Sequence, residues 1–232
     1  MERTFDQLLD HLKGELLKMG GAVEESIDQA VRSLVGRDND LAQTVIDGGK
    51  DIDDWEVKIE EECLRLLVVQ QPVASDLRLI ATTMKINYDL ERVNDQAVNI
   101  AQRALVLNQF PMLKPLIDIP RMAELTRSMV NDALDAFVNR DVNLANKVRK
   151  IDDLVDGLRD QVFRELLTYL HGQTDTTLID RAIQLILVSR HLERIGDHAS
   201  NISENAVYLV QGRIVRHKKE ELEDLEMEDT EV

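Results

Sequence analysis

The chain repeats itself, and this internal duplication constrains its fold more than any other feature of its sequence. The pattern Arg-Asp-x-x-Leu-Ala-x-x-Val occurs at 37–45 and again at 140–148, a shift of 103 residues. The segment LERVNDQAVNI at 90–100 matches LERIGDHASNI at 192–202, with seven identities in eleven positions and a shift of 102 residues. Self-similarity of this kind is the signature of a duplicated structural unit. The sequence therefore predicts two copies of one unit.

A proline-rich segment separates the two copies. Pro111, Pro115 and Pro120, three of the four prolines in the chain, lie there, and proline sterically blocks the continuation of a helix. We expect a first unit at 1–110, a second at 116–212 and an acidic tail at 213–232. The tail carries eight acids in its last thirteen residues. Such a block of like charges usually stays solvated, and binding to a partner is the alternative.

The composition favours long helices over strands. Aromatic residues make up only 3% of the chain, and ten glycines and four prolines are its only strong helix breakers. These breakers divide the chain into six expected helices, at 4–35, 39–70, 74–108, 118–139, 142–171 and 175–212. Apolar residues that recur every three or four positions give such helices a face to bury. The prediction is an all-α fold of two tandem three-helix bundles related by the duplication.

Several residues have an expected structural role. Asp38 and Asp141 stand at the start of the second helix of each unit, where an aspartate side chain caps free backbone N–H groups. Trp55 and Cys63 continue an apolar stripe, so we expect both in the core.

Charge and cysteine content restrict the functions open to the chain. The 44 acids and 28 bases give a formal net charge of −16, which repels the phosphate backbone of nucleic acids. The single cysteine cannot form an internal disulfide, and the first twenty residues lack the apolar core of a signal peptide. We therefore expect a cytoplasmic protein that neither binds nucleic acid nor inserts into a membrane.

Each copy carries a row of acidic side chains on its third expected helix. The rows are Glu91, Asp95 and Asn99 in the first copy and Glu193, Asp197 and Asn201 in the second. Their four-residue spacing puts each row on one side of its helix, away from the apolar stripe. Carboxylates one turn apart can bind a hard cation when a neighbouring helix completes the site. The candidates on that neighbouring helix are Asp53 and Asp156, with Glu56 and Asp152 as less symmetric options.

A solvated acidic surface is the alternative interpretation of the two rows. Exposed acids are common in a chain with 44 of them, and Arg92 and Arg194 can neutralise the rows locally. His191 and His198 flank the second row, but the first copy has other residues at their positions. We therefore expect them to be surface histidines rather than metal ligands.

The familiar catalytic motifs are absent from the sequence. It contains no glycine-rich phosphate loop, no Gly-x-Ser-x-Gly and no His-Glu-x-x-His, so we expect no enzymatic activity and no catalytic residues. A di-metal carboxylate enzyme is one alternative, but such sites need Glu-x-x-His pairs. Each of the five histidines lacks an acid three residues before it. An inert helical scaffold is the other alternative.

The segment at 56–80 and the repeated LERxxDxAxNI pattern together resemble the PhoU family. The resemblance extends from about residue 5 to about residue 212, and QPxAxDLR at 71–78 is its most specific part. It implies a cytoplasmic, homodimeric adaptor that restrains phosphate uptake. The implied partners are the ATPase subunit of the phosphate ABC transporter and the sensor histidine kinase of the phosphate-starvation response.

The same resemblance implies bound metal. Some members of the family hold divalent or trivalent ions, in multinuclear iron or zinc clusters, through a motif that falls here on Glu91, Asp95, Glu193 and Asp197. Gly49 in the first copy stands where the second has Asp152. The two sites would therefore not be equivalent.

Overall fold

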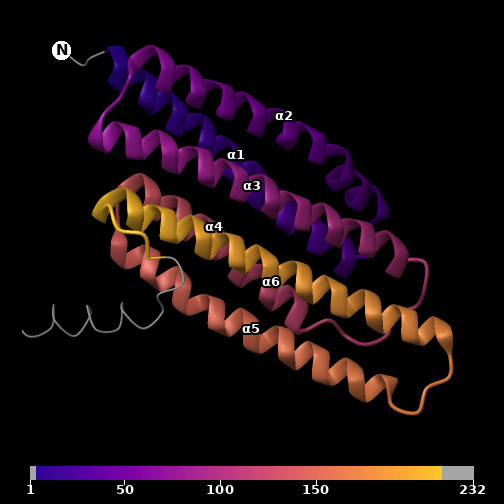
Figure 1. Cartoon of the computed structure of the whole chain (residues 1–232). Helices are drawn as coiled ribbons and strands as arrows, with labels where there is room; N and C mark the ends of the chain where they lie inside the picture. Colours follow the sequence, from indigo (N-terminus) through magenta and orange to yellow (C-terminus); the bar gives the residue numbers. More distant parts are fainter. Residues whose placement is uncertain (1–3, 216–232) are drawn as a thin grey trace, which may run out of the picture.

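The computed structural model describes residues 4–215, which form six helices and no strand. The helices are α1 (Thr4–Val35), α2 (Asn39–Gln70), α3 (Ala74–Leu107), α4 (Asp118–Asn139), α5 (Val142–Leu170) and α6 (Thr176–Gln211) (Figure 1). Every helix begins and ends within one residue of its predicted position. The all-α fold with a tandem duplication is confirmed. The acidic tail expected at 213–232 lies outside the described residues from position 216 onward.

Local residues account for where the helices begin and end. The carboxylates of Asp38 and Asp141 accept hydrogen bonds from the backbone N–H three residues on, at 2.9 and 3.0 Å. Both predicted N-caps are therefore confirmed. The residue before each cap, Arg37 or Arg140, has a left-handed backbone with φ of 56° or 55°. The duplication thus extends to the backbone conformation of the turns.

The two three-helix units lie side by side. α3 packs against α6 and α1 against α4, while α2 covers α1 and α3, and α5 covers α4 and α6. In Figure 1, α2 and α5 accordingly run along opposite edges of the molecule. Within residues 4–215, α2 and α5 do not contact each other. The α3–α6 and α1–α4 pairs therefore carry the contact between the two helical units.

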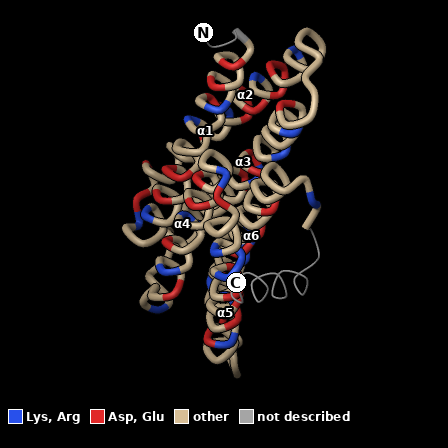
Figure 2. Tube along the Cα trace, turned by 90° about the vertical axis from the view of Figure 1, so that its left-hand side faces the viewer, with Lys and Arg blue, Asp and Glu red and all other residues tan. Residues whose placement is uncertain are grey.

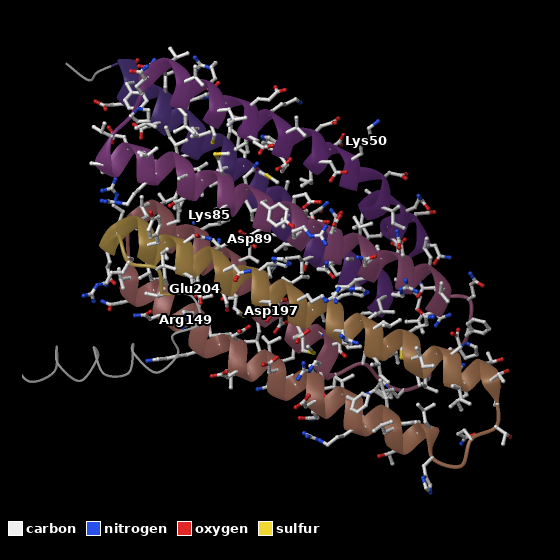
Figure 3. The ribbon with its side chains drawn as sticks, viewed as in Figure 1. Lys50, Lys85, Asp89, Arg149, Asp197 and Glu204 are labelled. Atoms are coloured by element: carbon white, nitrogen blue, oxygen red, sulfur yellow. The ribbon has the colours of Figure 1, made fainter. Side chains whose placement is uncertain are left out.

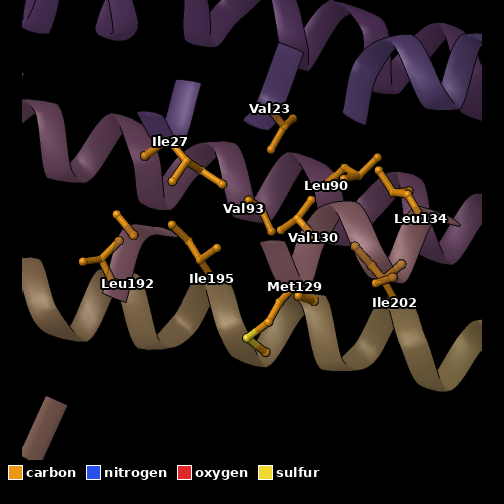
Figure 4. Packing of buried hydrophobic residues seen from close by; sticks show 14 of the residues in the cluster. Val23, Ile27, Leu90, Val93, Met129, Val130, Leu134, Leu192, Ile195 and Ile202 are labelled. Carbon is orange, nitrogen blue, oxygen red and sulfur yellow. The ribbon is translucent and has the colours of Figure 1, made fainter. Parts of the chain in front are cut away.

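A single hydrophobic core runs through both units. Ile27 of α1, Leu90 of α3, Val130 of α4 and Leu192 of α6 are completely buried, and Figure 4 shows them among the side chains that fill the space between these helices. Burying an aliphatic side chain of this size contributes about 1.5–3 kcal/mol. Continuous packing of this kind joins the two units into one folded body.

The residues expected in the core differ in their burial. Cys63 is completely buried, as predicted, and burial raises the pKa of its thiol to about 12. Trp55 is only half-buried: its ring packs against the core, while its indole N–H donates a hydrogen bond to Glu15 at 3.3 Å. The indole nitrogen needs a polar partner, and this requirement keeps the ring at the edge of the core.

Charged residues of both signs are interspersed along the helices (Figure 2). Many form pairs within one helix, such as Lys18 with Glu15 at 2.7 Å and Arg65 with Glu62 at 2.5 Å. Among the described residues, no helix combines the length and the apolar character that crossing a membrane requires.

Candidate functional site

Three of the predicted ligands meet at the contact between α2 and α3. Asp53, Glu91 and Asp95, here called the first acidic cluster, each place one carboxylate oxygen within 4.8 Å of the others. A hard cation holds its oxygen ligands at about 2.0–2.6 Å, so oxygens around one ion lie up to about 5 Å apart. The packing of α2 against α3 thus creates the spacing that a cation requires.

Negative charge accumulates in the first acidic cluster. Burial and then the neighbouring Asp95 raise the pKa of Glu91 to about 7, and Asp53 and Glu56 add to the effect. Arg92 opposes it: its Nη1 lies 2.6 Å from Asp95 Oδ2 and 4.0 Å from Glu91 Oε1. One arginine does not balance the cluster, so a bound cation would lower its electrostatic energy.

The remaining three predicted ligands lie at the contact between α5 and α6. Asp156, Glu193 and Asp197, here called the second acidic cluster, influence one another electrostatically. Burial and then Asp197 raise the pKa of Glu193, while Arg159 acts in the opposite direction. The Nη1 atom of Arg159 lies 2.9 Å from Glu193 Oε1. This cluster therefore already contains a positive charge.

The glutamates of the acidic rows are partly buried, while Asp197 of the second row is exposed. The side chains of Glu91 and Glu193 retain 21% and 19% of their full exposure, while Asp95 retains 39%. The rows thus combine partial burial with access to solvent.

The sequence difference at Gly49 is compensated on the facing helix. A Cβ at Gly49 would lie 3.1 Å from Val98 Cγ2 and 3.8 Å from Asn94 Nδ2. In the second unit the small residue is on the other helix, where a Cβ at Gly196 would lie 3.0 Å from Asp152 Oδ1. In the first unit the glycine is on α2 and the polar residue, Asn94, is on α3. In the second unit the polar residue, Asp152, is on α5 and the glycine is on α6.

Polar pairs connect α3 and α6 between the two acidic clusters, and we call them the polar seam. The pairs are Asp89–His198 at 2.9 Å, Gln96–His191 at 2.9 Å and Arg103–Gln184 at 3.1 Å. Successive pairs are seven residues apart on each helix, which is the repeat of antiparallel helices in coiled-coil contact. The polar seam thus fixes the register of the two units.

The prediction that His191 and His198 are surface residues was wrong. Both are half-buried, and His198 Nδ1 donates its hydrogen bond to Asp89, whose side chain is only 9% exposed. Burial and then the charge of Arg103 lower the pKa of His191 to about 4. The seven-residue spacing of His191 and His198 was the available signal. Their partners on α3 could not be identified until the two helices were aligned.

A groove of about 640 Å³ opens beside the Asp89 end of the polar seam. Lys85, Asp89 and Glu204 line it, and Figure 3 shows them along the strip between α3 and α6. Lys85 also lies over the ring of Tyr208, 5.2 Å from its centre, and Arg149 lies 3.9 Å from Glu204. The charges lining this groove are of both signs.

Known proteins resemble this chain over nearly all of its described length. The family model described as PhoU domain matches residues 16–104 and 119–206, one match in each unit. A protein of Aquifex aeolicus named phosphate-specific transport system accessory protein PhoU homolog is 45% identical, over 90% of this chain and 94% of its own. The Escherichia coli K12 protein of the corresponding name is 34% identical, over 92% of this chain and 88% of its own.

Solved structures show the same architecture. The crystal structure of PhoU from Pseudomonas aeruginosa has a TM-score of 0.86 at 40% identity, covering 90% of this chain and all of that one. The crystal structure of the phosphate transport system regulatory protein PhoU from Streptococcus pneumoniae has a TM-score of 0.84 at 30% identity, covering 91% and 99%. Both likenesses extend across the two units.

Proposed function

The chain belongs to the PhoU family, and from this premise we propose that it is a phosphate-transport accessory protein that restrains phosphate uptake and phosphate-starvation signalling. The likeness to accessory proteins of phosphate-specific transport, which spans both units, is the observation that carries the proposal. The protein acts without catalysis, by changing the population of an inhibited state in its partners.

The partners in this proposal are the ATPase subunit of the phosphate ABC transporter and the sensor histidine kinase of the phosphate response. The protein works in the cytoplasm, as a homodimer, as an adaptor between the two. Support comes from the names of its relatives, which describe accessories of a transport system. A rigid body of two like units offers two related faces, which is a suitable arrangement for contacting two partners.

We further propose that the acidic clusters bind metal ions. The donor set of the first acidic cluster consists of carboxylate oxygens, which suit hard cations such as Mg²⁺, Mn²⁺ and Fe³⁺. It contains no cysteine or histidine, the ligands typical of zinc sites. The raised pKa of Glu91 supports the same interpretation, because it arises from burial first and then from the negative charges of Asp95, Asp53 and Glu56, which a bound cation would offset. Iron in a small carboxylate-bound cluster therefore fits better than zinc.

A deletion strain tests the regulatory proposal. Without this gene, cells grown in high phosphate should express their starvation genes and take up phosphate without restraint, and the wild-type gene should restore control. Normal repression in the deletion strain would overturn the proposal. Phosphate uptake and a reporter of starvation genes are both measured, so that effects on transport and on signalling are separated.

A variant of the acidic rows distinguishes a metal-dependent regulator from an inert scaffold. Glu91→Gln, Asp95→Asn, Glu193→Gln and Asp197→Asn are combined in one chain and returned to the deletion strain. We expect loss of regulation, although the carboxamides keep the size of the original side chains. An equal number of exposed acids changed on α1 serves as the control for net charge. Intact regulation in the row variant would favour the scaffold.

A further inference from the structure

The two acidic clusters carry opposite charges at one position beside their ligands. One turn after Asp53, α2 carries Glu56, and at the equivalent position of α5, 103 residues on, the chain carries Arg159. Other positions also differ in charge: Gly49 corresponds to Asp152, Val57 to Asp160 and the exposed Lys50 to Asp153. At position 159, however, the changed side chain contacts carboxylates of the second acidic cluster itself. This difference replaces a negative charge with a permanent positive one, since an arginine stays protonated in proteins.

Arg159 lies among the carboxylates of the second acidic cluster. Its Nη1 is 2.9 Å from Glu193 Oε1 and 4.0 Å from Asp156 Oδ1, and its Nη2 is 2.8 Å from Asp160 Oδ1. The side chain of Arg159 is 31% exposed and that of its partner Glu193 on α6 is 19% exposed. A charge pair with this little exposure is screened less by water than a surface pair.

We propose that the guanidinium of Arg159 is the resident cation of the second acidic cluster, and that the chain binds metal at the first acidic cluster alone. This inference rests on the proposed metal binding and specifies where it occurs. A metal ion entering the second acidic cluster would have to displace a tethered cation, leaving two positive charges close together.

At the position equivalent to Arg159 the first acidic cluster has Glu56, so it lacks this internal cation. Its arginine, Arg92, is on the same helix as the acids it contacts, with 40% of its side chain exposed. The second unit has an arginine at the same position, Arg194, so this residue does not distinguish the clusters. Among the described residues, the first acidic cluster is the only group of three possible ligands within 4.8 Å of one another. Geometry and charge therefore favour the same cluster.

The inference is tested by exchanging the charges at the equivalent positions 56 and 159. The full chain is stripped with chelator, loaded with Mn²⁺ or Fe³⁺, desalted and analysed for metal per chain. Arg159→Glu gives the second acidic cluster the residue of the first, and we expect about a two-fold rise in bound metal. Glu56→Arg makes the opposite change, and we expect loss of metal. Arg164→Glu, an exposed position on the same helix α5, is the control for net charge.

A second pair of variants leaves Arg159 in place, so the test does not depend on the folding of the Arg159→Glu chain. Glu193→Gln with Asp197→Asn should leave bound metal unchanged, and Glu91→Gln with Asp95→Asn should remove it. Halved metal in the first of these variants would overturn the inference while leaving the proposed metal binding intact. Absence of metal from the wild-type chain would overturn both. The thermal midpoint, with and without metal, gives an independent second measurement for every variant.

Discussion

Glu91→Gln should stabilise the metal-free protein at alkaline pH, although it removes a candidate ligand. The pKa of Glu91 is about 7 in the folded chain against an ordinary value of 4.5. The folded state therefore binds this proton more tightly than the unfolded state does. The resulting stabilisation is complete below about pH 4.5 and is lost as the pH rises through 7. Above pH 7 the charged Glu91 opposes folding, and glutamine does not.

The size of this effect follows from the shift in pKa. At about 1.4 kcal/mol per pKa unit, the shift corresponds to at most about 3.5 kcal/mol. Water reaches the carboxylate, whose side chain is 21% exposed, so we expect about 1–2 kcal/mol at pH 8 after screening. In a chain of this length, each kcal/mol raises the unfolding midpoint by about 2–4 °C.

Denaturant unfolding, followed by circular dichroism in the presence of chelator, measures this effect. The unfolding free energy of the wild type should fall between pH 5 and pH 8 by about 1–2 kcal/mol more than that of Glu91→Gln. Glu61→Gln, at an exposed position of α2, removes the same charge and should follow the wild type. Saturating metal should reverse the order, because a bound ion stabilises only the chain that retains its ligand. Equal or lower stability of Glu91→Gln at pH 8 in chelator would refute the reasoning.

Three further substitutions test the packing around the site by unfolding free energy. Gly49→Asp should cost about 1–3 kcal/mol of unfolding free energy by overpacking against Val98. Adding Asn94→Gly and Val98→Ser, which gives α3 the residues of the second unit at these positions, should recover at least half of that cost. Additive costs would contradict the proposed exchange. His198→Ala should cost about 2–3 kcal/mol, because it leaves a buried carboxylate without its main donor, whereas the exposed His171→Ala should cost less than about 0.5 kcal/mol. Asp141→Ala should cost about 1 kcal/mol through loss of the N-cap; no change would show that the bond in the structure contributes little.

The sequence predicted the helices accurately because their limits depend on local chemistry. The N-caps at Asp38 and Asp141 and the prolines at 111 and 115 act within a few residues, and each appears directly in the sequence. The acidic rows were equally visible, since a four-residue spacing places side chains on one side of a helix whatever surrounds it. Their role as metal ligands stays a prediction.

Features that depend on helix register could not be predicted from one sequence. The role of Arg159 depends on α5 lying beside Glu193 of α6, and the pairing of His191 with Gln96 depends on how α3 and α6 align. Periodicity within one helix identifies a buried face, but it does not identify the residue opposite. Trp55 illustrates the same limit, because its partner Glu15 is on another helix, forty residues away.

The polar seam also explains why the two units pair with each other rather than each with a second copy of itself. The duplication places Asp89 and His191 at equivalent positions, and likewise Gln96 and His198. In the chain, α6 supplies both histidines as donors and α3 supplies both acceptors. Two α6 helices in the same register would place histidine opposite histidine, and two α3 helices would place Asp89 opposite Gln96 without a histidine. The two copies have thus diverged along the polar seam so that α3 matches α6. Pairing of α3 with α3, or of α6 with α6, leaves polar side chains poorly matched.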